Sequence, residues 1–385
     1  SMDNVRLGII GVGAIGSTHL KNAAALKRAT VTAVCDVVPR RARTATAEHG
    51  CRAYLNAGEM LRDGVCDAVV IATPHYDHVP LGIAALDTGH HVLVEKPIAV
   101  HKTAGQRLIA AHERHPDLAF AAMFQMRTQP HFQRIKRLVD GGELGDLLRV
   151  NWIVSDWFRT QAYYDSGGWR ATWAGEGGGV LTNQAPHNLD LLQWICGMPE
   201  RVWAACSLGK RHRIEVEDEV TAYLAYPGGG TGVFVTSTGE TPGTNRLEIA
   251  GERGKLVLEE GMMTFTRNQL PAGEFLRTSP ERFARPATDT EVTPAEGRSG
   301  LHAEVLRNFA AAILDGEPLI APAAEGIHSV ELANAMLYSS LTGQPVDLPL
   351  DGAAFERELQ KLVATSTYVK PEIREVEGDV ERSFH

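Results

Sequence analysis

Cysteine and long apolar runs are scarce in this chain. Its 385 residues include five cysteines, an odd number without any Cys-x-x-Cys pair (Cys35, Cys51, Cys66, Cys196 and Cys206). This pattern argues against a disulfide framework or a structural zinc site and favours a reducing compartment. No apolar run approaches the roughly 18 residues that a membrane span needs, and a secretory leader is not expected. We therefore expect a soluble, cytoplasmic protein.

An excess of basic residues is also missing. Lys and Arg total 38 against 47 Asp and Glu, which gives a formal charge of −9, while apolar residues make up 44% of the chain. Nucleic acid and anionic membranes are therefore not expected partners, because few basic residues remain to neutralise phosphates. The apolar fraction is ordinary for globular proteins, and the length exceeds one domain of about 150 residues, which predicts two domains.

The first motif lies between an expected strand and an expected helix. The apolar run Val5–Ile10 is typical of a buried parallel strand, and helix-forming residues extend from 17 to 27. Between them lies Gly11-Val12-Gly13-Ala14-Ile15-Gly16. In this context Gly11 permits a tight turn, Gly13 lets a pyrophosphate approach the backbone, and Gly16 lets the helix pack on the strand. The string predicts a dinucleotide site at a helix N-terminus.

A second expected strand, 30–35, ends at Asp36, 20 residues beyond the last glycine of that string. In a Rossmann fold a carboxylate at this place accepts hydrogen bonds from the adenosine ribose. The alternative is a turn aspartate without a ligand. A carboxylate repels a 2′-phosphate and so favours NAD over NADP. NADP stays open, because three arginines that follow would either hold that phosphate or form a solvated helix turn (Arg40, Arg41 and Arg43).

Two further expected strands end in polar residues. The run 67–72 precedes Thr73-Pro74-His75, and the run 90–94 precedes Glu95-Lys96-Pro97. Ligands of open parallel sheets bind beyond the carboxyl ends of the strands, so Asp36, Thr73 and Lys96 are expected in one cleft. Most lysines are solvated surface groups. Lys96, however, lies between an apolar strand and a proline and is expected to face the cleft.

After Phe124 the pattern changes to successive strands with short turns between several of them, which predicts an antiparallel sheet. Strands are expected at 150–158, 202–208, 220–226, 231–238, 246–250 and 255–259, and helices at 130–139, 180–195, 304–314 and 325–341. Residues 1–124 and 125–385 are therefore predicted to form separate domains. Residues 268–300 are polar and aperiodic, and are expected to be either a disordered excursion or a lid.

The expected helix 180–195 carries Asn183, His187 and Asp190 on one face, at i, i+4 and i+7. A lone helical histidine is more often a hydrogen-bonded structural group than a catalyst. The triple glycine 177–179, however, would let the helix start approach a ligand. A metal site is not expected, because His187 and Asp190 lack a third ligand.

All six tryptophans fall between residues 152 and 203. Trp169 and Trp173, in a glycine-rich loop, are candidates for a sugar-binding wall, with ordinary core packing as the alternative. Trp152 is expected in the core, together with either Trp194 or Trp203. Arg159 and Arg170 are either exposed loop residues or a clamp for a carboxylate or phosphate.

Together these motifs resemble the Gfo/Idh/MocA family of sugar and polyol oxidoreductases. The matching features are the glycine string, Ala72-Thr73-Pro74 with His78 four residues beyond, Glu95-Lys96-Pro97, and the triple glycine ahead of His187 and Asp190. The resemblance implies an α/β protein with an N-terminal Rossmann domain and a C-terminal α/β domain built on a large, mainly antiparallel open sheet. It also implies a homodimer or homotetramer, for which the exposed sheet face is the expected surface.

The resemblance further implies site residues. Those expected at the cofactor are Gly11, Gly13, Ala14, Ile15, Gly16, Asp36, Arg40, Thr73, Pro74, His78, Glu95, Lys96, Gln125 and Arg170. Those expected at the substrate are Lys96, Arg159, Trp169, Arg170, Asn183 and His187. Many family members carry Asp where this chain has Asn183. A subset near nucleotide-sugar 3-dehydrogenases and ketosugar reductases has a similar Asn-Gln-x-x-His string, which favours an amino- or uronate-type sugar, free or nucleotide-linked.

The sequence thus predicts a dehydrogenase that moves hydride between a secondary alcohol of a sugar or cyclic polyol and nicotinamide. His187 is expected to accept the hydroxyl proton, Lys96 to stabilise the oxygen, and Asn183 to orient the substrate or His187. Two rivals remain. A glycosidase that uses tightly held NAD is disfavoured by Lys96 in its Glu-Lys-Pro string. A dinucleotide-binding regulator without turnover would not need the Lys96 and His187 pair.

Overall fold

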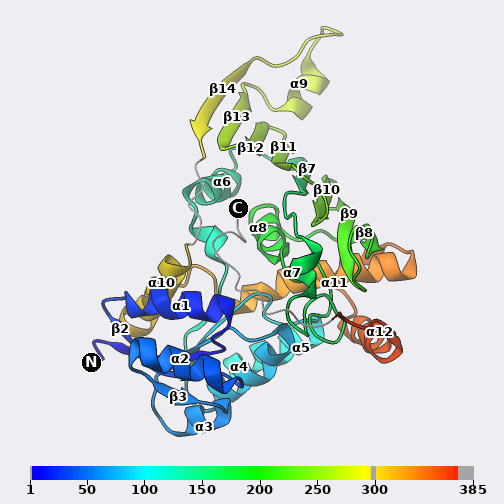
Figure 1. Cartoon of the computed structure of the whole chain (residues 1–385). Helices are drawn as coiled ribbons and strands as arrows, with labels where there is room; N and C mark the ends of the chain where they lie inside the picture. The colour runs from blue at the N-terminus through cyan, green and yellow to red at the C-terminus, as the bar shows by residue number, and fades with distance from the viewer. Residues whose placement is uncertain (1, 296–300, 372–385) are drawn as a thin grey trace.

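The computed structural model describes residues 2–295 and 301–371, which form two sheets with helices around them (Figure 1). The first sheet contains β1 (Val5–Ile10), β2 (Ala29–Cys35), β3 (Arg52–Tyr54), β4 (Ala68–Ile71), β5 (His91–Val94) and β6 (Phe120–Ala122). Its strand order is β3-β2-β1-β4-β5-β6, and all neighbours are parallel. The predicted Rossmann domain is confirmed.

Helices cover both faces of this sheet, which explains why its strands are apolar throughout. On one face α1 (Ala14–Ala24) and α2 (Pro39–His49) are joined by α10 (His302–Asp315), whose Phe309 packs with Leu7 and Ile9. The sequence groups α10 with the second domain, yet it packs against α1 and β1. On the other face are α3 (Ala57–Arg62), α4 (His78–Asp87) and α5 (Lys102–Glu113).

The second sheet has nine strands in the order β14-β13-β12-β11-β7-β10-β9-β8-β15. Neighbours are antiparallel, except that β7 and β10 run parallel, so the prediction of a mainly antiparallel sheet is confirmed. The strands are β7 (Leu147–Val154), β8 (Arg201–Leu208), β9 (Glu217–Ala225), β10 (Thr231–Ser237), β11 (Asn245–Gly251), β12 (Gly254–Glu259), β13 (Met262–Asn268), β14 (Thr288–Pro294) and β15 (Val346–Asp347).

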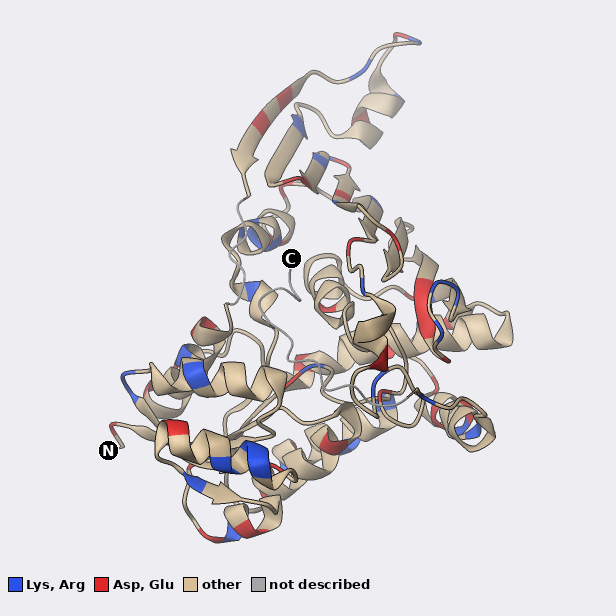
Figure 2. Ribbon diagram, viewed as in Figure 1, with Lys and Arg blue, Asp and Glu red and all other residues tan. Residues whose placement is uncertain are grey.

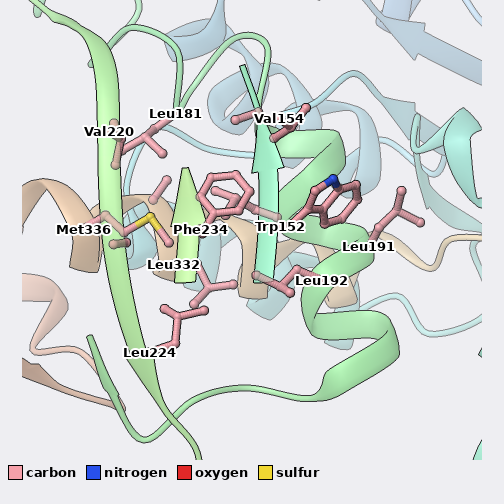
Figure 3. Close-up of a cluster of buried hydrophobic side chains, with 14 of the residues drawn as sticks. Trp152, Val154, Leu181, Leu191, Leu192, Val220, Leu224, Phe234, Leu332 and Met336 are labelled. Atoms are coloured by element: carbon pink, nitrogen blue, oxygen red, sulfur yellow. The ribbon is translucent and has the colours of Figure 1, made fainter. Parts of the chain in front are cut away.

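Helices line one face of this sheet and build the second core. In Figure 3, Trp152 of β7 and Phe234 of β10 lie near Leu192 of α8 (Pro186–Cys196) and Leu332 of α11 (Ile327–Thr342). The remaining elements are α6 (Pro130–Asp140), α7 (Gln161–Asp165), α9 (Ala272–Thr278), α12 (Gly352–Thr365) and the 3₁₀ turns η1 (His75–Asp77), η2 (Gln125–Thr128) and η3 (Ala323–Gly326).

The expectation for residues 268–300, a disordered excursion or a lid, is wrong for the part that the structure describes. Residues 268–295 include α9 and β14, and β14 pairs with β13 as the outermost strand, at the far end of the sheet in Figure 1. Nearly all residues of β14 are exposed, so both faces of this strand meet solvent. The alternation that marks a half-buried strand is therefore missing. Residues 296–300 lie outside the described residues.

Charged residues are distributed over the elements of both domains (Figure 2). The basic residues of α2 lie in its first turns. Across residues 2–295 and 301–371, no helix combines the length and apolar character of a membrane span. The same residues contain no group of three or more His, Cys, Asp or Glu placed to hold a metal ion.

Candidate active site

The loop between β1 and α1 has the shape that its glycines allow. Gly11 has a φ of +89°, and a Cβ on it would lie 2.7 Å from the carbonyl oxygen of Ala72, while a Cβ on Gly16 would lie 1.8 Å from the oxygen of Gly11. At Gly13 the nearest atom would be a guanidinium nitrogen of Arg41, 3.8 Å away. Among the described residues no side chain caps α1. Room above an uncapped helix N-terminus, with Ala14 exposed and Ile15 half-buried beside it, fits a pyrophosphate.

Asp36 braces this loop at the end of β2. Its carboxylate oxygens accept hydrogen bonds from the backbone N–H of Val12 (3.0 Å) and of Val38 (2.8 Å), and only 7% of the residue is exposed. Arg40 and Arg41 line a cavity of about 170 Å³ between α1 and α2. The carboxylate and the basic side chains thus lie on adjacent sides of the loop.

The ends of β4 and β5 are tied together by His78. Its ring nitrogens lie 2.7 Å from the carbonyl oxygen of Pro97 and 2.8 Å from that of Thr73, and the residue is fully buried. Thr73 and Pro74 remain partly exposed at the strand end. His78 therefore holds the two segments together inside the domain and cannot contact a ligand. Thr73 and Pro74 are the residues at this strand end that remain accessible.

Glu95 is buried below Lys96 and belongs to a histidine cluster that the sequence reasoning missed. Glu95 Oε1 lies 2.6 Å from Nε2 of His19 in α1, and Oε2 accepts a hydrogen bond from the backbone N–H of Lys96 (3.1 Å). The ring of His302 in α10 lies 5.4 Å from that of His19. Burial alone would raise the pKa of Glu95, but the hydrogen bond and charge of His19 lower that pKa to about 2. Glu95 is therefore an anion.

Lys96 connects the two domains, because its Nζ donates a hydrogen bond to the backbone carbonyl of Asn183. Burial lowers the pKa of Lys96; the carboxylates of Glu95 and Glu176 oppose this shift, and the guanidinium groups of Arg159 and Arg170 add to it. A partly buried lysine with a lowered pKa is a candidate for proton or oxyanion chemistry.

His187 lies in the first turn of α8 and is 2% exposed. Its Nε2 lies 3.4 Å from Nε2 of Gln125 in η2, and the Phe124 ring meets its ring edge to face at 6.3 Å. Burial, together with the charge of Lys96, holds the pKa of His187 well below its usual range. The ring is therefore neutral at neutral pH and able to accept a proton.

The predicted helix 180–195 is shorter than expected, because α8 begins at Pro186. Proline lacks an N–H and suits the first helical position. Ahead of it the backbone forms turns, in which Asn183 N–H donates to Gly179 (3.0 Å) and Ala185 N–H to Val180 (2.8 Å). Asn183 thus precedes the helix that carries His187, and its carbonyl is available to Lys96.

The triple glycine was expected to let a ligand approach, but protein atoms fill the space beside it. A Cβ on Gly177, at φ +71°, would lie 2.0 Å from the Val100 side chain, and one on Gly179 would lie 2.0 Å from the backbone oxygen of Glu217. The fully buried carboxylate of Glu217 accepts hydrogen bonds from the N–H groups of Gly179 (2.7 Å) and Leu181 (3.1 Å). Burial raises the pKa of Glu217 to about 7.

Arginines and aromatic rings gather beside Lys96. The Arg170 guanidinium lies 4.2 Å from the centre of the Tyr163 ring and 4.5 Å from that of Trp169, and it donates to the Tyr163 hydroxyl (2.6 Å). Arg159 lies 5.3 Å from the Tyr163 ring. Because both guanidinium groups affect the pKa of Lys96, the loop adds positive charge to the site.

One tryptophan lies elsewhere than expected, and an alternative between two others is resolved. Trp173 is 3% exposed and belongs to the second core, so it is no part of a sugar-binding wall, whereas Trp169 is half-buried. Trp203 is 59% exposed, and Trp194 packs against the second core. The cause is the alternation of β8, in which Val202 and Ala204 face inward and Trp203 faces solvent.

Two further residues with buried roles were missed. Arg127 of η2 donates two hydrogen bonds of 2.8 Å to Asp190 of α8 and also contacts Glu325 at 3.0 Å, so Asp190 belongs to a buried ion pair. Glu176 is 1% exposed, and its carboxylate accepts hydrogen bonds from the Asn183 amide (2.7 Å) and the Ala171 N–H (2.8 Å). Arg127 bonds to a residue 63 positions away, which no local pattern encodes, and Glu176 bonds to its neighbours Ala171 and Asn183 through an irregular loop that no helical or strand period marks.

Comparison with known proteins agrees with this geometry. Residues 5–123 match the sequence model of an oxidoreductase family with an NAD-binding Rossmann fold, GFO_IDH_MocA, and residues 132–257 match that of the GFO/IDH/MocA C-terminal domain. Together the two matches cover more than half of the chain.

Inositol 2-dehydrogenase of Salmonella typhimurium is 31% identical over 150 residues, which cover 38% of this chain and 45% of that protein. The chain thus matches less than half the length of this relative. Inositol 2-dehydrogenase 2 of Saccharopolyspora erythraea is 27% identical over 353 residues, covering 89% of this chain and 96% of that protein. The crystal structure of the WlbA dehydrogenase from Bordetella pertussis, in complex with NADH and UDP-GlcNAcA, is 28% identical with a TM-score of 0.76, covering 90% of this chain and all of that one.

Proposed function

The chain belongs to the Gfo/Idh/MocA family of oxidoreductases, and on that premise we propose that it is an NAD-dependent dehydrogenase of a sugar or cyclic polyol. The reaction moves hydride between a secondary alcohol and nicotinamide, with Lys96 and His187 at the reacting oxygen. The observation that carries this proposal is the meeting of two segments at Lys96. Lys96 follows a strand of the Rossmann sheet and bonds to Asn183, four residues before His187.

The two side chains have complementary tasks. His187 is neutral and buried, so it accepts the proton of the substrate hydroxyl as the carbon loses hydride. Lys96 donates a hydrogen bond to the same oxygen and stabilises the negative charge that develops there. Asn183 orients the substrate. General-base assistance of this kind contributes about 10²–10⁴ in rate.

Bound NAD supplies the hydride acceptor. The pyrophosphate would lie over Gly13 at the N-terminus of α1, where a Cβ meets almost no other atom. Asp36 would accept hydrogen bonds from the ribose, and its charge would disfavour a 2′-phosphate, which supports NAD over NADP. Gln125, Thr73 and Pro74 complete the cofactor contacts of the proposal.

For the substrate we propose an anionic sugar, either a uronate or a nucleotide-linked sugar. Arg159 and Arg170 bring two guanidinium groups to the site, and guanidinium binds carboxylate and phosphate through paired donors. The buried Nε of Arg170 has no hydrogen-bond partner among the described residues. The WlbA dehydrogenase, bound to UDP-GlcNAcA, is consistent with this class.

The test is reduced-nicotinamide formation with NAD and with NADP across polyols, aldoses, uronates and nucleotide sugars, beside a Lys96→Ala variant. We expect turnover with NAD and an anionic sugar, and its loss in the variant. Cofactor binding without turnover on any substrate would contradict the proposal. Release of free sugar from a glycoside without net reduction of NAD would instead identify a glycosidase.

A homodimer or homotetramer stays a prediction. Apolar side chains on the outer face of the nine-stranded sheet support it, since Ile153, Trp203 and Tyr223 are 37%, 59% and 47% exposed. A second copy of the sheet would cover them. Light scattering of the purified protein would give the mass, and a monomeric mass at micromolar concentration would exclude both assemblies.

A further inference from the structure

Glu176 is the buried carboxylate that joins the substrate loop to the segment holding Lys96. One carboxylate oxygen accepts from the Ala171 N–H at 2.8 Å and the other from the Asn183 side-chain amide at 2.7 Å. The backbone carbonyl of Asn183 in turn accepts from Lys96 Nζ. A single side chain thus connects the residue that follows Arg170 with the residue that binds Lys96.

The loop around Glu176 is built for this contact. Ala171 is fully buried and has a φ of +59°, a left-handed conformation that is unfavourable for a residue with a Cβ. A Cβ on Gly175 would lie 2.0 Å from the backbone oxygen of Trp169. The chain therefore folds tightly from Trp169 to Glu176. The backbone oxygen of Glu176 also lies 3.2 Å from Nδ1 of His75, which ties the loop to the Rossmann domain.

We propose that Glu176 is a positioning residue for the reaction: its carboxylate fixes the Asn183 amide and holds the Arg170 loop in register with Lys96. A carboxylate only accepts hydrogen bonds, so the amide must turn its NH₂ group towards Glu176. The side-chain oxygen of Asn183, Oδ1, is then the atom that is available to a substrate hydroxyl. This inference rests on the proposed dehydrogenase function.

The charge of Glu176 acts on Lys96 as well. Several charged or titratable groups face Lys96 from the surrounding elements, namely Glu95, Glu176, Arg159, Arg170, His75, His187 and His302. Of these only Glu95 and Glu176 are acids, and Glu95 already pairs with His19. Removing the Glu176 charge should therefore lower the pKa of Lys96 further and move the alkaline limb of the turnover profile to lower pH.

The experiment uses Glu176→Gln, Asn183→Asp and the double variant, with Glu217→Gln as a matched control. In Glu176→Gln an NH₂ group faces the NH₂ of Asn183, so the Asn183 amide must turn and present the wrong group to substrate. We expect kcat/KM to fall roughly ten- to a hundredfold, in line with one unsatisfied buried polar group. Asn183→Asp alone places two carboxylates together and should also lose activity.

The double variant restores the bond with its polarity reversed, because the new amide at position 176 donates to the new carboxylate at position 183. It also returns a negative charge to the neighbourhood of Lys96. We expect it to be more active than either single variant and to move the alkaline limb back. Glu217 is equally buried but hydrogen-bonds only to backbone N–H groups, so Glu217→Gln should leave the turnover profile unchanged.

The outcomes distinguish a failure of the proposed function from a failure of the positioning role of Glu176. If the wild-type protein shows no turnover on any substrate, the proposed function fails. If the wild type turns over while Glu176→Gln behaves like Glu217→Gln, or the double variant is no better than the poorer single variant, the positioning role of Glu176 is refuted. NADH binding, followed by fluorescence, should stay near wild type in all four variants.

Discussion

Helix α8 carries two buried polar side chains less than one turn apart, and their surroundings differ. Asp190 receives two hydrogen bonds of 2.8 Å from Arg127, with a third contact of 3.3 Å from Gln193. His187 lies 3.4 Å from Gln125, in an environment that keeps its ring neutral. Full satisfaction of a buried charge fixes a structural frame. His187 is neutral and its contact to Gln125 is long, so its ring is still able to accept a proton. Helix α8 therefore carries both a structural ion pair, through Asp190, and the proposed base, His187.

The largest effect is expected at the chemical end of the helix. His187→Gln keeps a side chain of similar size but removes the base, so kcat should fall by about 10²–10⁴, or roughly 3–5 kcal/mol. The pKa of His187 is lowered by burial, so wild-type turnover should be retained on acidification to below pH 6.5, its usual value. Steady-state kinetics across pH and thermal unfolding check both points. A stable variant with near-normal kcat would remove His187 from the mechanism.

A substitution of Asp190 is expected to change the free energy of unfolding by a comparable amount but not to affect the chemical step. Among the described residues, Asp190→Asn leaves the buried Arg127 guanidinium with only the partly exposed Glu325 carboxylate as an anionic partner, which should lower the free energy of unfolding by at most about 3–5 kcal/mol. Denaturant unfolding measures the change. The double variant Arg127→Met, Asp190→Leu removes both charges and should recover much of the loss. Equal instability in single and double variants would mean that the packing, not the charge pair, stabilises this contact.

The two positions also differ in how well their roles could be predicted from the sequence. The glycine string and Lys96 were predicted from their places at the ends of parallel strands, whereas His187 was predicted from the resemblance to the family. Arg127 and His19 were missed because they bond to residues 63 and 76 positions away, a separation that no local pattern encodes. Glu176 was missed because its bonds to Ala171 and Asn183 depend on an irregular loop that no helical or strand period marks.

Other features that were misplaced or left open had a local signal. Pro186 suits a first helical position and marks the start of α8, while Val202 and Ala204 at alternate positions of β8 indicate that Trp203 faces outward. For β14 no such signal exists, because both faces of this strand are exposed. Local signals thus locate elements and strand ends, whereas the polar network around the site depends on tertiary contacts.

Glu217 offers a smaller test, on stability alone. Its pKa rises from 4.5 in an unfolded chain to about 7 in the fold because of burial, so the folded state binds the proton more tightly. The stabilisation is complete below pH 4.5 and is lost as pH rises through 7, a change of roughly 3 kcal/mol. Glu217→Gln cannot ionise, so its unfolding free energy relative to wild type should rise across this window. Parallel stability curves for the two proteins would contradict the buried, protonated carboxyl.

The smallest expected effect compares two glycines of one loop. Gly13→Ala places a methyl where the nearest atom is 3.8 Å away, at an ordinary φ of −70°, so unfolding should change by no more than about 1 kcal/mol. The methyl nevertheless occupies the space proposed for the pyrophosphate, and the Kd for NAD should rise about tenfold or more. Gly16→Ala is the control, because its methyl would lie 1.8 Å from the Gly11 oxygen and must disturb the fold itself. Calorimetric titration and thermal unfolding separate the two. If Gly13→Ala bound NAD as tightly as wild type, the space above α1 would not hold the cofactor, and the proposed dehydrogenase would need another NAD-binding site.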